Sequence, residues 1–175
     1  MTQKLYIPIG IPGSGKTTYW RERFDKEHVL RISRDDINTM LSEDVYTQNI
    51  NNVIKDSEQV VLESAINAGF SVYIDRVNLT PNSRKRFINK ALTINKKMYV
   101  VGLYFTPDLQ EALKRNIDRP DKTTKQKDSL LEYIPEAFKL ITAPTFEESI
   151  DEIIYIDSNG NTTSMETLRE FNKSD

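Results

Sequence analysis

Short apolar runs alternate along the chain with longer amphipathic stretches. Runs rich in β-branched and aromatic residues predict five strands, at residues 5–9, 29–32, 71–74, 98–105 and 152–157. The stretches between them favour helices; Leu109, Ala112 and Leu113, for example, follow the i, i+3, i+4 spacing. Helices are predicted at residues 17–26, from residue 34 onward, and at 49–68, 81–95, 108–119 and 130–139, with a short helix after residue 163.

This alternation is typical of a mainly parallel sheet covered by helices on both faces. With right-handed crossovers, it predicts an α/β protein of three-layer α/β/α architecture, built on a five-stranded, mainly parallel sheet. No linker divides the chain, so residues 1–175 are interpreted as a single domain. The polar stretch 119–127 is interpreted as a small lid, although an ordinary solvated loop would have the same composition.

Composition narrows the class of protein. Of the 175 residues, 38% are hydrophobic and 29% are charged, which suits a soluble domain with a core. A net charge of −2 argues against a protein that coats long stretches of duplex, but not against an enzyme that grips one chain end. The chain has no cysteine, one histidine and no recognisable signal peptide, so we expect a cytoplasmic protein without a structural zinc site.

The strongest motif lies between the first predicted strand and the helix that follows. The sequence Gly10-Ile11-Pro12-Gly13-Ser14-Gly15-Lys16-Thr17 is a full match to G-x-x-x-x-G-K-[ST], and Thr18 follows it. Glycines let backbone N–H groups surround an anion, and the helix N-terminus adds partial positive charge. Residues 10–18 are therefore predicted to bind ATP, with Lys16 on the outer phosphates and Thr17 as a ligand of Mg²⁺.

A pair of aspartates follows the second predicted strand. Ser33 and Asp36 have the spacing of a helix cap, which gives Asp36 a structural interpretation and leaves Asp35 free. Asp35 would project at the carboxyl edge of the sheet, where ligands of open α/β folds bind. A carboxylate there can accept the proton of an attacking hydroxyl, so Asp35 is the candidate general base.

Three segments together carry a family resemblance. The strings IPIGIPGSGKTTYW…ISRDDI, YIDRVNLTP and LKRNIDR resemble the kinase domain of the bacteriophage and eukaryotic 5′-polynucleotide kinases, over residues 5–119. The resemblance implies a P-loop kinase fold and an ATP- and Mg²⁺-dependent transfer to the 5′-hydroxyl of DNA or RNA, with Asp35 as base. It also implies that Lys16, Arg115 and Arg119 stabilise the transferring group.

The same resemblance assigns the acceptor side. Arg34, Asp35, Asp75, Arg76 and Asn78 would bind the acceptor, and Asp75 would reach Mg²⁺ through water or pair with an arginine. Because Arg115 and Arg119 are four residues apart, they are predicted to share a helix face. A solvated basic face is the alternative for this pair.

Two departures from the family bear on the acceptor. Asn38 stands where the phage enzymes carry an arginine that contacts the acceptor's 3′-phosphate, and Val77 stands where threonine is usual. Replacement contacts would come from Arg34, Arg76 or the basic run Arg84-Lys85-Arg86, a run that is also compatible with a solvated helix face.

Two other functions remain open from the residues. The acceptor of a P-loop kinase can instead be a nucleoside, a nucleotide, a modified base or another small-molecule hydroxyl. A nucleotide-dependent regulatory module with no acceptor would carry the same P-loop. The sequence leaves the oligomeric state undetermined.

Overall fold

The computed structural model of the chain describes residues 2–43, 45–120 and 123–168. The strands are β1 Lys4–Ile9, β2 Val29–Ser33, β3 Ser71–Asp75, β4 Tyr99–Phe105, β5 Glu152–Ile156 and β6 Thr162–Thr167. The helices are α1 Lys16–Arg23, α2 Arg34–Ser42, α3 Gln48–Asn67, α4 Pro81–Ile94, α5 Leu109–Ile117 and α6 Thr124–Leu140, with a short 3₁₀ helix η1 at Phe146–Glu148.

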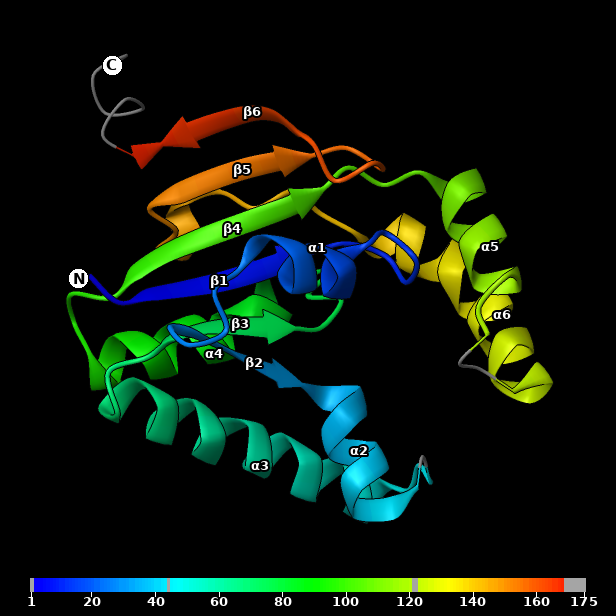
Figure 1. Cartoon of the computed structure of the whole chain (residues 1–175), viewed down its shortest axis with the longest axis horizontal. Helices are drawn as coiled ribbons and strands as arrows, with labels where there is room; N and C mark the ends of the chain where they lie inside the picture. Colours follow the sequence, from blue (N-terminus) through cyan, green and yellow to red (C-terminus); the bar gives the residue numbers. More distant parts are fainter. Residues whose placement is uncertain (1, 44, 121–122, 169–175) are drawn as a thin grey trace.

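The six strands form one sheet in the order β2-β3-β1-β4-β5-β6. The first five are parallel to their neighbours, and β6 pairs antiparallel with β5. The carboxyl ends of the parallel strands therefore share one edge, and α5 and α6 lie beyond that edge in Figure 1. The α/β P-loop kinase fold is confirmed, but with a sixth strand.

The predicted helix after residue 163 is wrong. Residues 162–167 form β6, which returns along β5 after a tight connection in which Gly160 adopts a φ of 81°. The β-branched Thr162 and Thr163 suit an extended chain, and pairing along β5 satisfies their backbone groups. Predicted helix ends also shift: α1 ends at Arg23, and α6 begins at Thr124.

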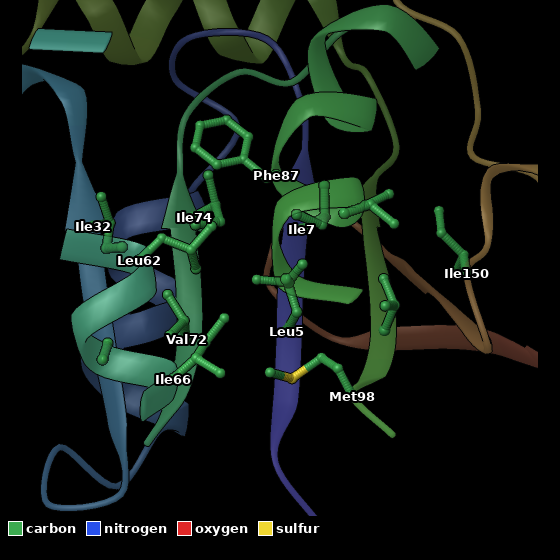
Figure 2. Packing of buried hydrophobic residues seen from close by; sticks show 14 of the residues in the cluster. Leu5, Ile7, Ile32, Leu62, Ile66, Val72, Ile74, Phe87, Met98 and Ile150 are labelled. Atoms are coloured by element: carbon green, nitrogen blue, oxygen red, sulfur yellow. The ribbon is translucent and has the colours of Figure 1, made fainter. Parts of the chain in front are cut away.

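Helices cover both faces of the sheet, as the alternating pattern predicts. On one face, α3 and α4 pack against the central strands; Figure 2 shows Leu62 and Ile66 of α3 facing Val72 and Ile74 of β3. On the other face, α1 packs with aromatic residues against β3 and β4. Each fully buried aliphatic side chain of this kind, such as Leu62, contributes about 1.5–3 kcal/mol.

A third apolar cluster fixes the phosphate-binding loop to the helices beyond the sheet edge. It joins Ile11 of the loop to Ala112 of α5, and to Ile134 and Ala137 of α6. The loop is thus held from both sides, by β1 beneath it and by this cluster. No helix of the described ranges is both long and apolar enough to cross a membrane.

The predicted lid at 119–127 changes in two respects. Residues 124–127 belong to the first turn of α6, whose N-cap Thr123 accepts a hydrogen bond from the Gln126 backbone N–H. Residues 121 and 122 lie outside the described residues. The interpretation of the remaining stretch as a lid stays a proposal.

Candidate active site

The loop from Gly10 to Thr17 connects β1 to α1, as its motif predicts. Gly13 and Gly15 have φ values of 86° and 93°, a region that side chains disfavour. A Cβ on Gly13 would lie 2.5 Å from Asn116 Nδ2 and 2.9 Å from the Ala112 carbonyl oxygen, so only glycine fits against α5. Gly15 is the N-cap of α1 and offers no side-chain acceptor to the first N–H groups of that helix. Those groups suit an anion.

Lys16 points back into its own loop. Its Nζ donates to the carbonyl oxygens of Gly10 and Ile11, at 2.9 and 2.8 Å, and to Ser14 Oγ at 3.1 Å. Burial lowers the pKa of Lys16 from 10.5 to about 8, the nearby charge of Arg119 also lowers it, and Asp75 and Asp35 oppose the change. A phosphate bound beside Lys16 would stabilise its charged form and raise its pKa.

The depressed pKa of Lys16 predicts that nucleotide affinity depends on pH. Below pH 8 the side chain is charged, and its burial cost is fully present. As pH rises from about 8 towards 10.5, the unfolded chain binds more protons than the folded one, so the free energy of unfolding rises. Nucleotide binding needs the charged form, so above pH 8 the affinity for ADP should fall, by up to about tenfold per pH unit.

Calorimetry checks this prediction. ADP titrations between pH 7 and 9.5, in buffers of different ionisation enthalpy, should reveal proton uptake above pH 8. The Lys16→Arg variant is the matched control, because a guanidinium does not lose its proton in this range. An ADP affinity that stays flat with pH in the wild-type protein would contradict the assignment.

Thr17 and Asp75 form the candidate metal site. Thr17 Oγ1 donates to Asp75 Oδ2 at 2.8 Å, and Asp75 ends β3 with a nearly buried side chain. Within the described residues, no group of three or more His, Cys, Asp or Glu side chains could hold a metal. One hydroxyl and one carboxylate suit Mg²⁺, which keeps several waters and takes its remaining ligands from phosphates.

Helix α2 presents the two aspartates differently. Ser33 caps the helix by accepting from the Asp36 backbone N–H at 3.2 Å, as predicted, and the Asp36 side chain pairs with Arg31. Asp35 is exposed and lines the cavity in front of the phosphate-binding loop. The same cavity is lined by Lys16, and the negative charge of Asp35 opposes the lowering of the Lys16 pKa.

One cavity of about 1630 Å³ brings most of the predicted residues together. Its lining includes the loop from Pro12 to Thr18, with Asp35, Asp75, Arg115 and Arg119 around it. Arg34, Arg76, Tyr46 and Tyr133 also line it. The cavity thus has a phosphate-binding wall and a wall that combines cations with aromatic rings.

The two arginines of the second wall are held by polar partners. Arg34 Nη2 donates to Asn51 Oδ1 at 2.7 Å, and Arg76 Nη1 donates to both oxygens of Glu58, at 2.8 and 2.6 Å. Glu58 is fully buried on α3 and also pairs with Arg86. Burial lowers the pKa of Arg76, with Glu58 opposing. Arg34 and Arg76 both act on the pKa of Tyr133, which burial raises.

Several acceptor-side expectations fit the structure less well. Asn78 does not line the cavity; it is buried, and its Nδ2 donates to the carbonyl oxygens of Pro8 and Ile74, at 2.8 and 3.1 Å. Asn38 is also fully buried, and its Oδ1 accepts from Ser42 Oγ at 2.8 Å. Asn38 therefore cannot contact an acceptor phosphate as the arginine at this position of the phage enzymes does.

Only Lys85 in the basic run at 84–86 is exposed to solvent, and none of the three residues lines the cavity. Arg84 is fully buried: Nε and Nη2 each donate to Glu148 at 2.6 Å, and Nη1 donates to the carbonyl oxygens of Asn78, Leu79 and Thr142. Arg86 pairs with Glu58, and Lys85 is exposed. Long-range partners, invisible in the local sequence, decide these roles.

The predicted shared helix face of Arg115 and Arg119 is wrong. Helix α5 ends at Ile117, so Arg119 lies beyond it, yet both side chains line the cavity. Arg115 also spans two segments: Nη1 donates to the Gly13 carbonyl oxygen at 3.3 Å, and Nη2 donates to the Ser158 carbonyl oxygen at 2.6 Å. Its Nε pairs with Glu111.

Some lining and supporting residues escape the sequence analysis. Ser158, Asn159 and Gly160 of the β5–β6 connection line the cavity. The turn sequence Asp-Ser-Asn-Gly-Asn at 157–161, followed by two threonines, is the signal that could have revealed this hairpin. The role of Arg31, which contacts Asp75, has no local signal.

Comparisons with known proteins concern the family and the fold of the chain. A family profile described as AAA domain matches residues 5–139. An L-seryl-tRNA(Sec) kinase from Methanococcus maripaludis is 28% identical over 121 residues, which cover 67% of this chain and 47% of the relative. The chain thus spans about half the length of that curated relative.

Solved structures share the fold. A chain of the Pnkp1/Rnl/Hen1 RNA repair complex is 23% identical with a TM-score of 0.55, over 82% of this chain and 48% of that one. A sugar kinase from Janibacter sp. HTCC2649 is 18% identical with a TM-score of 0.59, over 91% of this chain and 87% of that one. At these identities the likeness concerns the fold, and the two proteins differ in what they act on.

Proposed function

Because this chain belongs to the AAA domain family and has a P-loop kinase fold, we propose that it transfers the γ-phosphoryl group of ATP to the 5′-hydroxyl end of DNA or RNA. The observation that carries the proposal is that Lys16, Thr17 and Asp35 line one cavity. A nucleotide tail on the loop and a hydroxyl beside Asp35 would meet there.

In the proposed reaction, the acceptor's 5′-oxygen forms a bond to the γ-phosphorus as the bond to the β-phosphate oxygen breaks. The hydroxyl proton passes to Asp35, and ADP leaves. Lys16 and Arg119 offset charge on the transferring group, and Arg115 holds the loop's Gly13 carbonyl. Thr17 and Asp75 would hold Mg²⁺, which when bound neutralises phosphate charge.

The second cavity wall favours a phosphate-bearing acceptor. Arg34 and Arg76 line the same cavity as Asp35 and can bind the phosphodiester that follows a 5′-terminal nucleoside. Tyr46 and Tyr133 are 56% and 42% exposed, so their rings are available to stack on a base. A neutral sugar would offer Arg34 no anion, because its partner Asn51 is uncharged, whereas Arg76 already pairs with Glu58.

A transfer assay tests this proposal. The protein is incubated with γ-labelled ATP and, in parallel, a 5′-hydroxyl oligonucleotide, its 5′-phosphorylated form, a nucleoside 3′-monophosphate, the nucleoside and gluconate. We expect label on the 5′-hydroxyl oligonucleotide and the nucleoside 3′-monophosphate, with kcat/KM at least about tenfold above that for the nucleoside, because a charge-assisted contact is lost.

Each other outcome points to a named alternative. Faster labelling of the nucleoside or of gluconate would contradict the nucleic-acid acceptor and favour a small-molecule kinase. ATP binding without transfer to any acceptor would favour a nucleotide-dependent regulatory module. Matched DNA and RNA oligonucleotides of increasing length then define the preferred acceptor.

A further inference from the structure

Arg31 lies at the centre of a charged cluster behind the candidate metal site. It belongs to the edge strand β2, opposite Tyr73 of β3. Its Nη1 donates to Asp75 Oδ2 at 2.6 Å, and its Nη2 pairs with Asp36. The guanidinium carbon lies 5.3 Å from the ring centroid of Trp20 on α1. The side chain is thus held on three sides.

The Asp75 carboxylate depends on this arginine for its charge balance. The side chain of Asp75 is only 6% exposed, and a buried carboxylate is costly without a cation beside it. Thr17 donates a hydrogen bond to the same oxygen, Oδ2, but brings no charge. Arg31 supplies the cation in direct contact with this carboxylate, in addition to the nearby charge of Lys16, and Asp36 and Trp20 fix the position of the guanidinium.

We propose that Arg31 is a positioning residue that holds Asp75 beside Thr17 and keeps divalent cations off this carboxylate until a nucleotide is bound. The inference rests on the proposed use of a metal–nucleotide substrate. A guanidinium in contact with Oδ2 repels a dication and occupies part of the carboxylate's coordination sphere. Nucleotide phosphates add negative charge at the loop, and this restores the attraction for the metal.

This arrangement would order the binding events. Metal would enter as a complex with the nucleotide, and free metal would not occupy the site in advance. The ordering matters because Lys16 must release its bonds to the loop carbonyls as phosphate arrives. A resident dication would repel the ammonium group of Lys16 at that moment.

Binding of Mn²⁺ to the nucleotide-free protein tests the proposal without any acceptor. Electron paramagnetic resonance measures free Mn²⁺ during the titration. Replacing Arg31 with methionine should tighten Mn²⁺ binding at least about tenfold, because the repelling charge is removed. Arg31→Lys should stay near wild type, and the double variant Arg31→Met/Asp75→Asn should lose the gain.

Lys26→Met is the matched control. Lys26 also lies over Trp20, at 5.7 Å from the ring centroid, but no contact with Asp75 involves it, so Mn²⁺ binding should not change. Unchanged Mn²⁺ affinity in a folded Arg31→Met protein would overturn the proposal, since a purely structural role would lower stability alone.

A second measurement needs no Arg31 variant. In the otherwise wild-type protein, Asp75→Asn should leave nucleotide-free Mn²⁺ binding unchanged, because Arg31 already shields that carboxylate. A weaker affinity in Asp75→Asn would show that metal uses Asp75 before nucleotide arrives, and would overturn the proposal. Failure of transfer to nucleic acid in the labelling assay would leave both metal results standing, so the two failures can be told apart.

Discussion

Replacing Arg119 with alanine should reduce phosphoryl transfer by about 1000-fold, the lower range for arginines that stabilise a transferring phosphoryl group. Arg119 lines the cavity beyond the end of α5, as Lys16 does within its loop, and we propose that both cations act on one phosphate tail. Single-turnover rates with saturating ATP and a 5′-hydroxyl oligonucleotide measure the loss. ADP affinity should change much less than the rate.

Lys114→Ala provides the matched control for Arg119. Lys114 is an exposed cation on α5 and does not line the cavity, so its removal tests whether overall charge alone matters. Its rate should stay close to wild type. A near-normal rate in Arg119→Ala would remove this arginine from the proposed mechanism.

Replacing Asp35 with asparagine should lower the transfer rate by at least about 100-fold, because a general base is lost while the shape of the side chain is kept. Nucleotide binding should persist, since the loop, Lys16 and Thr17 are intact. Rates with the 5′-hydroxyl oligonucleotide and calorimetry with ADP separate the two effects.

Asp56→Asn controls for loss of a surface carboxylate, because Asp56 is exposed on α3 and lies outside the cavity lining. It should transfer at the wild-type rate. If Asp35→Asn also keeps that rate, the proposed role of Asp35 as base is excluded. The P-loop kinase fold would be unaffected by that result.

Local signals account for the parts of the molecule that could be predicted. The glycine-rich loop is encoded in eight consecutive residues, Gly10–Thr17, and the structure places it between β1 and α1 as the motif requires. Ser33 and Asp36 form their predicted cap within four residues. Asp35 and Asp75 reach one cavity because parallel strands end at the same edge.

Contacts between distant segments decide most of the side-chain roles that the sequence does not predict. Arg84 meets Glu148, 64 residues away, and Arg31 meets Asp75, 44 residues away. A basic run is compatible with a solvated helix face as long as its acidic partners, far away in the sequence, are unknown. The predicted end of α5 at residue 119 is wrong for a different reason. The apolar spacing stops at Ile117, and the chain leaves the helix at Asp118.

The close packing of Gly13 against α5 limits how Arg119, which follows this helix, could move. The loop contacts Ala112 and Asn116 of α5 at Gly13. Arg115 of the same helix donates hydrogen bonds to the carbonyl oxygens of Gly13 and Ser158, so α5 is fixed to both the loop and the β5–β6 hairpin. A movement of the whole of α5 would break these contacts. A motion that carries Arg119 towards a substrate must therefore begin after Ile117. The segment that bears Arg119 would move while helix α5 stays in place.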